Sequence, residues 1–140
     1  SLEEIYKLTN LSENFSINEL ADTSLTKNLQ KTSEIINESN YKPEDVMLIL
    51  RTFLQKAKRL LNLYEKQDEN ENLDSLIDNY KPPIFWKDKP IVKRQLEKWS
   101  KSGIKDLIVN INKTEAFLKK NSSNGLILVF NFIYETSEKS

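Results

Sequence analysis

The spacing of apolar residues between positions 46 and 64 constrains the fold of this chain more than any other feature. Large apolar side chains recur there every three or four residues, which is the period of an α-helix and not that of a β-strand. They are Val46, Ile49, Leu50, Phe53, Leu54, Ala57, Leu60, Leu61 and Tyr64. A helix with one wide apolar face has to bury that face. The segment therefore predicts a long helix packed against other elements.

The rest of the chain shows the same pattern in shorter pieces. Pro43 suits the first turn of the long helix, and residues 65–72 contain no apolar residue, so we expect a loop after it. Further helices are expected over residues 2–10, 24–39, 73–80, 90–100 and 104–118, the last two separated by Ser102 and Gly103.

One more helix is expected to begin at Ser16 and to end at about Ala21. Ser16 is a candidate N-cap, with Glu19 as its reciprocal partner three residues later. Phe15, just before the cap, is expected to pack on Leu20, four residues after it. Three signals therefore agree on a helix start at this position.

Residues 126–135 are apolar on nearly all sides, and this pattern alone fits a buried strand or a buried helix. In an otherwise helical chain we expect a helix. The sequence therefore predicts an all-α fold, a bundle of about five to six helices.

Composition narrows the classes of function. The chain has 140 residues with 21 basic and 21 acidic side chains, no cysteine, no histidine and two glycines. Histidine is the commonest general base and metal ligand, and cysteine would be needed for thiol chemistry. Two glycines do not make a glycine-rich phosphate loop. We therefore expect no catalytic residues, no cofactor and no metal, and an enzyme is the least favoured class.

The longest apolar run, "GLILVFNFIY", is too short to span a bilayer. We expect no membrane partner, and the lack of cysteine suits a cytoplasmic location.

Charge is distributed unevenly along this neutral chain. Residues 65–78 contain six acidic residues and one lysine, whereas residues 81–105 contain eight basic and two acidic residues. An acidic loop is thus followed by a basic segment.

The basic segment opens with "YKPPIFWKDKP", residues 80–90, which holds three of the four prolines. Proline excludes an ordinary helix or strand there, yet Phe85 and Trp86 lie in this stretch. One interpretation is that exposed aromatics stack on unpaired bases, at about 1–3 kcal/mol per base, while lysines attract phosphates. The other is that both aromatics pack on neighbouring helices while the lysines stay solvated. Trp99 is expected in the core, from its helical spacing to Leu96 and Ile91.

In the order of its elements, the chain resembles the C-terminal part of the delta subunits of the bacterial DNA polymerase III clamp loader. "FSINELADTSLTKNLQKTSEIINESNYKPEDVMLILRTFLQKAKRLLNL" is similar to a short helix, a set of small helical pieces and a long helix of that family. "KPPIFWKDKPIVKRQLEKWS" resembles the junction that opens the family's next helix, and two closing helices follow. The resemblance covers the chain from about Phe15 to its end.

The resemblance implies two parts: residues 1–14 as the end of a lid domain or a linker, and residues 15–140 as a collar helical domain. Collar domains of five subunits form the ring that holds such a loader together while it places the sliding clamp on primed DNA. It implies a non-catalytic chain whose partners are other clamp-loader subunits and possible primer–template DNA. Contact with the sliding clamp is implied only through an N-terminal part, so about two further domains are expected upstream.

The resemblance also implies roles for single residues. A collar lies over the entry of primer–template DNA, so Trp86 is expected to stack on a base, while Phe85 is assigned to packing. The residues expected to hold phosphates nearby are Lys87, Lys89, Lys93 and Arg94.

The apolar last helix yields a second expectation, because uncovered apolar surface marks an interface. Its subunit-interface candidates are Leu126, Val129, Phe130 and Ile133. The alternative is that this helix is simply the central one of the bundle. The alternative function for the whole chain is a self-standing helical nucleic-acid-binding module.

Overall fold

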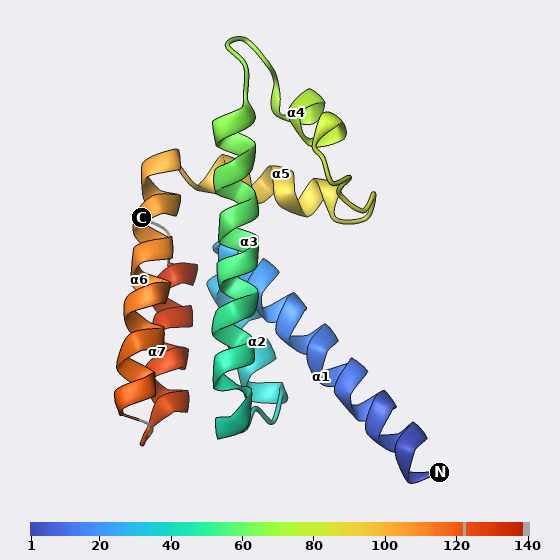
Figure 1. Cartoon of the computed structure of the whole chain (residues 1–140), viewed down its shortest axis with the longest axis vertical. Coiled ribbons are helices and arrows are strands. Elements are labelled where there is room, and N and C mark those ends of the chain that lie inside the picture. Colours follow the sequence, from blue (N-terminus) through green and yellow to red (C-terminus); the bar gives the residue numbers. More distant parts are fainter. Residues whose placement is uncertain (122, 139–140) are drawn as a thin grey trace.

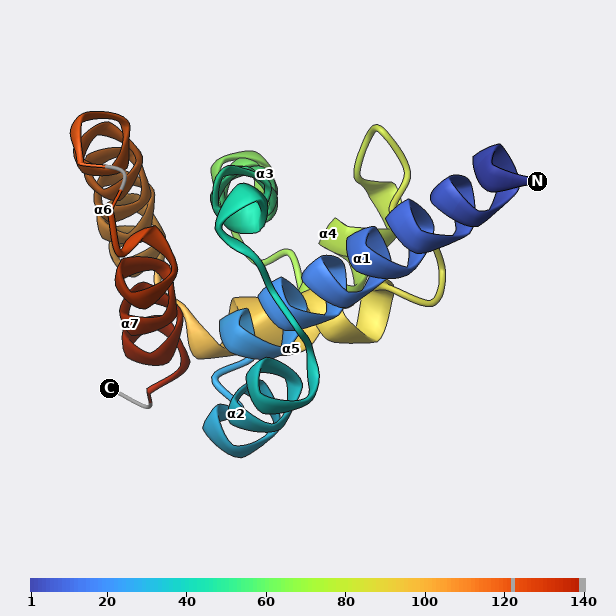
Figure 2. The ribbon, with the colours of Figure 1, turned by 90° about the horizontal axis from the view of Figure 1, so that it is seen from below.

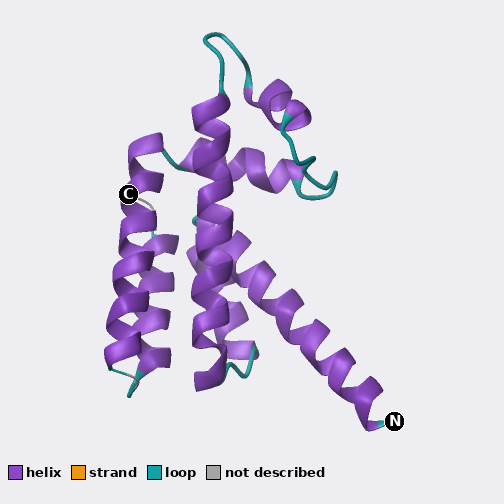
Figure 3. Ribbon diagram, in the orientation of Figure 1, coloured by secondary structure: helices purple, strands orange, loops and turns teal. Residues whose placement is uncertain are grey.

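The computed structural model describes residues 1–121 and 123–138, and within them the chain is built from helices and loops alone (Figure 3). The expected all-α fold is therefore confirmed, with slightly more helices than the five to six expected. The helices are α1 (Leu2–Leu25), α2 (Leu29–Glu38), the 3-10 turn η1 (Pro43–Asp45), α3 (Val46–Lys66), α4 (Leu73–Asn79), α5 (Lys89–Lys98), α6 (Lys101–Lys120) and α7 (Gly125–Ser137).

The long helix α3 is the centre of the bundle, and α1, α6 and α7 all pack on it (Figure 1). α6 and α7 form an antiparallel hairpin along one side of α3, and α2 packs on α1 and α7 (Figure 2). α4 and α5 pack on each other beside the C-terminal end of α3. The N-terminal half of α1 projects away from all other helices (Figures 1 and 2).

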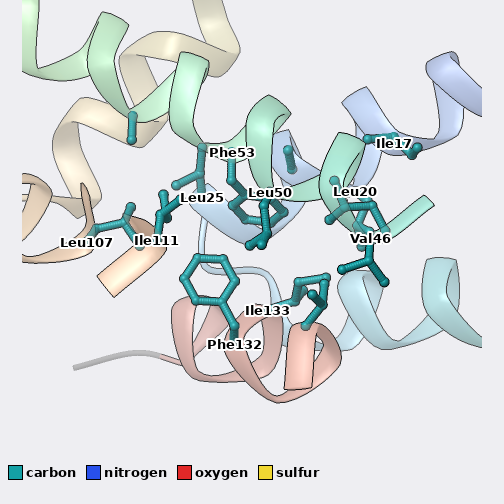
Figure 4. Packing of buried hydrophobic residues seen from close by; sticks show 14 of the residues in the cluster. Ile17, Leu20, Leu25, Val46, Leu50, Phe53, Leu107, Ile111, Phe132 and Ile133 are labelled. Atoms are coloured by element: carbon teal, nitrogen blue, oxygen red, sulfur yellow. The ribbon is translucent and has the colours of Figure 1, made fainter. Parts of the chain in front are cut away.

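Two hydrophobic clusters lie along α3. The first is formed by α1, α2, the N-terminal part of α3, α6 and α7, and the rings of Phe53 and Phe132 meet edge to face in it, with centroids 5.4 Å apart (Figure 4). The second joins Leu60 and Leu63 of α3 to α4, α5 and the loop between them. Trp99 packs against both clusters, as its spacing predicts, and its Nε1 donates to the carbonyl of Leu25 at 2.8 Å. The apolar stripe of α3 is thus divided between two partner sets.

α1 is one continuous helix, so the expected helix start at Ser16 is wrong. The Ser16 hydroxyl lies 2.7 Å from that of Tyr41 and 3.1 Å from that of Ser39, so it caps nothing. Phe15 is 71% exposed and does not cover Leu20. No glycine or proline interrupts residues 2–25, and helix propagates through them. The expected boundary between residues 14 and 15 falls inside this helix.

Two other breaks lie near, but not at, the expected positions. α1 ends at Leu25 and α2 begins only after Asn28, whose side chain accepts from the backbone N–H of Lys31 at 3.1 Å. α5 and α6 are separated at Ser100, which caps α6 by accepting from the N–H of Gly103 at 2.9 Å. Gly103 therefore lies in the first turn of α6 and does not break it. A Cβ on Gly103 would lie 3.1 Å from the Ser100 hydroxyl, so glycine leaves room for this cap.

Candidate nucleic-acid interface

The loop between α4 and α5 is anchored at both ends. Tyr80 and Ile84 are buried in the second cluster. The N–H of Asp88 donates to the carbonyl of Phe85 at 2.9 Å, and that of Lys89 to the carbonyl of Trp86 at 3.4 Å, so the chain turns directly into α5. Buried side chains and backbone hydrogen bonds therefore define the path of this loop.

Phe85 and Trp86 form an exposed aromatic pair on this anchored loop. Their side chains are 57% and 67% exposed, their ring centroids lie 5.9 Å apart and the ring planes are tilted by 55°. The assignment of Phe85 to packing is wrong, because the neighbouring Ile84 takes the buried position of this segment. The alternative in which both aromatics pack on neighbouring helices fails for the same reason.

The basic candidates divide into two groups. Lys87 lies with the aromatic pair, its Nζ 5.4 Å from the centroid of the Trp86 ring. Lys89 and Lys93 turn toward α4 and form ion pairs with its aspartates. Arg94 is exposed on another side of α5, where it lines a cavity together with α1 and α3. The structure thus brings Trp86 and Lys87 together, places Lys89 and Lys93 next along α5, and leaves Arg94 apart.

The cavity beside Arg94 has a volume of about 520 Å³ and a wall of mixed polar and apolar surface. Asp22 in this wall pairs with Lys56 at 3.0 Å and also accepts from the side-chain amide of Gln95 at 3.1 Å. Gln95 itself is fully buried, and its Oε1 has no hydrogen-bond partner among the described residues. This polar cluster ties α1, α3 and α5 together behind the candidate interface.

The four subunit-interface candidates on α7 differ in their exposure. Val129 and Ile133 are 0% exposed because α1, α3 and α6 of the same chain cover them, so they are not available to a partner. Leu126 and Phe130 are half-buried and pack against the same cluster. The exposed apolar residue of this helix is Ile127. α7 thus fits the alternative of a helix that belongs mainly to the core.

A larger apolar surface lies on the projecting half of α1, and sequence reasoning missed it. Six large apolar side chains there are each at least 60% exposed. They are Leu2, Ile5, Tyr6, Leu8, Leu11 and Phe15. The signal was the spacing of three residues among Leu2, Ile5, Leu8 and Leu11, which drifts around a helix and does not keep these side chains on one face. We call these six residues the α1 stripe.

Other chemical features of the described residues are few. In residues 1–121 and 123–138, no three His, Cys, Asp or Glu side chains gather as they would to hold a metal ion. No helix in that part of the chain is both long and apolar enough to cross a bilayer. Burial raises the pKa of the Tyr64 phenol and lowers the pKa of the Lys27 ammonium, whose Nζ lies 4.0 Å from the centroid of the Trp99 ring.

Among the described residues, the loop between α4 and α5, which we call the aromatic loop, exposes its aromatic pair and Lys87, and the α1 stripe is exposed as well; these are candidate recognition surfaces. A comparison with models of protein families, with curated proteins and with solved structures finds no match to this chain.

Proposed function

We propose that this chain is the C-terminal, collar-like domain of a clamp-loader delta subunit, which assembles with other loader subunits and contacts primer–template DNA. The proposal draws on the resemblance of residues 15–140 to that family. The observation that carries it is the exposure of Trp86 and Phe85 on an anchored loop at the start of a basic segment. Packing within the chain does not explain why two large aromatic side chains stay in solvent, so their exposure favours a role in recognition.

The physical basis of the DNA contact is stacking combined with attraction of phosphates. A base has an apolar face that an exposed indole can cover, and Lys87 beside the ring supplies a positive charge close to the same place. Because the loop is held by Ile84 and Tyr80, binding does not have to order it first, which removes an entropic cost.

Assembly with other subunits needs a surface that the isolated chain leaves uncovered. The α1 stripe is such a surface, and Phe117 on α6 is a second exposed aromatic, at 53%. In this proposal partner subunits cover the α1 stripe, while α7 holds the bundle together from within.

The DNA contact is tested with a dye-labelled primer–template oligonucleotide, titrated with the chain at low salt and followed by anisotropy. Trp86→Ala is expected to weaken binding about 5- to 150-fold, which corresponds to the loss of one stacked base. Phe117→Ala is the matched control, since it removes another exposed aromatic side chain, at a position beyond the basic segment of residues 81–105. Equal affinities of the wild type and Trp86→Ala would refute the contact.

Assembly is tested by co-sedimentation with the other subunits of a clamp loader. Ile5→Asp with Leu8→Asp is expected to release the chain from the partners, because charge on the α1 stripe has to be desolvated on binding. Leu48→Asp, at an exposed apolar position of α3, is the control. The exposed aromatic pair by itself also fits the alternative function, a self-standing nucleic-acid-binding module. It predicts DNA binding by the wild type without any co-sedimentation.

A further inference from the structure

Two lysines of the basic segment each form an ion pair with an aspartate of the same chain. The Nζ of Lys89 lies 3.0 Å from the Oδ1 of Asp78, and the Nζ of Lys93 lies 3.0 Å from the Oδ1 of Asp74. The Lys93 ammonium also donates to the second carboxylate oxygen of Asp74 at 3.0 Å. Both lysines stand one helical turn apart on α5, and both aspartates stand one turn apart on α4. The two pairs therefore form a ladder between neighbouring helices.

The position of α4 does not depend on these ion pairs. Leu76 and Ile77 on its inner face are buried against Val92 and Leu96 of α5. Apolar burial of this kind contributes about 1.5–3 kcal/mol per side chain, far more than an exposed ion pair. The carboxylates of Asp74 and Asp78 are thus held in front of α5 by packing beneath them. A change at these carboxylates alone is expected to leave the fold intact.

The carboxylates are the outer members of the ladder. The side chains of Asp74 and Asp78 are 70% and 62% exposed, whereas those of Lys93 and Lys89 are 41% and 35% exposed. An approaching phosphate therefore meets negative charge before it reaches either ammonium group. Lys87, two residues before Lys89, forms no ion pair among the described residues and is exposed beside Trp86.

We infer that α4 is an internal competitor for phosphate: Asp74 and Asp78 occupy Lys93 and Lys89 in the free chain and lower its affinity for DNA. This inference rests on the proposed function, since it concerns regulation of the same interface. Exposed ion pairs are weak, so a nucleic-acid strand that is already stacked on Trp86 can exchange its phosphates for the two carboxylates. The two ion pairs therefore lower the affinity for strands that bind through the lysines alone more than the affinity for strands that also stack on Trp86.

The inference is tested with the full chain carrying Asp74→Asn and Asp78→Asn, and with a control carrying Glu65→Asn and Glu69→Asn. Both double variants remove two negative charges from the same acidic stretch, but the control residues form no ion pair among the described residues. The probe is the dye-labelled primer–template oligonucleotide, titrated from low to moderate salt. Thermal unfolding confirms that each variant folds.

The Asp74→Asn, Asp78→Asn variant is expected to bind the oligonucleotide about 2- to 30-fold more tightly than the wild type, from the release of two exposed pairs. Its affinity is also expected to fall more steeply with salt, because two further lysines then neutralise phosphates. The control variant is expected to gain clearly less. Where the wild type binds the oligonucleotide, equal gains in the two variants, which indicate a general charge effect, or no gain in either would overturn the inference.

A second readout separates this inference from the proposed function. Lys89 and Lys93 are acylated with a limiting amine-reactive reagent without DNA, and the rates are compared by mass spectrometry with that of Lys87. Slow modification of both lysines, accelerated to the Lys87 rate in the Asp74→Asn, Asp78→Asn variant, supports the ladder even if no form of the chain binds DNA. In that case the proposed DNA contact alone fails. Rates equal to that of Lys87 in the wild type overturn the ladder whatever the oligonucleotide shows.

Discussion

Replacing Tyr64 by Phe removes a single oxygen atom from the joint that holds α5 in place. The Tyr64 hydroxyl, on α3, donates to the carbonyl of Leu96 and lies 2.6 Å from the carbonyl of Trp99. These carbonyls belong to the last turn and the C-cap of α5, where the helix itself supplies no partner for them. The rest of the ring stays in place, so the substitution creates almost no cavity.

The expected cost follows from these contacts. One hydroxyl proton serves two carbonyls, so the variant loses one shared hydrogen bond and leaves two partly buried acceptors without a donor. A hydrogen bond contributes about 0.5–1.5 kcal/mol net, and an unsatisfied buried acceptor costs about 1–3 kcal/mol. We expect Tyr64→Phe to lower the free energy of unfolding by about 1–3 kcal/mol at neutral pH.

The same side chain predicts a dependence on pH. Burial raises the pKa of the Tyr64 phenol above its ordinary value of 10.0. Above pH 10 the unfolded chain therefore loses this proton while the folded chain keeps it. The unfolded state then binds fewer protons, and stability falls as the pH rises. The gap in stability between the wild type and Tyr64→Phe should therefore shrink above pH 10.

Lys27 acts in the opposite direction, and the comparison of the two proteins removes its effect. Desolvation lowers its pKa below 10.5 in the folded chain, so the unfolded chain holds more protons just below that pH and stability rises there. This contribution is present in both proteins. Urea unfolding at pH 7 and at pH 10.5, followed by circular dichroism, measures both gaps. A gap under 0.5 kcal/mol at pH 7, or one that does not shrink at the higher pH, would refute this reasoning.

Four further substitutions test the packing, capping and polar contacts of the bundle. Phe53→Ala should lower the free energy of unfolding by about 3–5 kcal/mol, because Phe53 is fully buried against Phe132. Phe15→Ala, at an exposed position, should change it by less than about 0.5 kcal/mol. Similar losses in the two variants would contradict the exposure of the α1 stripe. Asn28→Ala should cost about 1 kcal/mol, measured in urea, since it removes the side-chain cap of α2, and an unchanged midpoint would argue against a helix start at that residue. Asp22→Ala should cost about 3 kcal/mol, because it leaves the largely buried Lys56 without its partner and removes one of the two acceptors of the Gln95 side-chain amide, which keeps only the backbone carbonyl of residue 22. A loss no larger than that of Asn28→Ala would mean that water replaces Asp22 in its cavity.

Much of the helical framework could be predicted from local patterns. The stripe of α3 is continuous and contains no breaker, so its period alone determined the element. The start of α4 likewise follows from the acidic, non-apolar loop before Leu73. These features depend on neighbours in sequence, which is the information that a single chain contains.

The errors arose where a distant residue decides the outcome. Ser16 has the surroundings of a cap, but its hydroxyl bonds to Tyr41, which is 25 residues away. The sequence of an almost entirely apolar helix does not show which of its faces is covered. The buried Val129 therefore could not be distinguished from the half-buried Leu126.

The candidate site shows the same limit. The sequence placed the aromatics and lysines together but assigned Phe85 to packing, because its exposure depends on Ile84 taking the buried position in the second cluster. The pairing of Lys89 with Asp78 depends on how α4 lies across α5, and no local pattern encodes that arrangement.

The emission of Trp86 during titration with primer–template DNA tests the central claim most directly. The exposed indole is at the proposed point of contact, whereas Trp99 is half-buried and hydrogen-bonded to Leu25. We predict saturable quenching in the wild type that weakens as salt is added and is absent in Trp86→Phe, which retains an aromatic ring but not the reporter. Unchanged emission over the whole titration at low salt would contradict the proposal that this loop stacks on DNA.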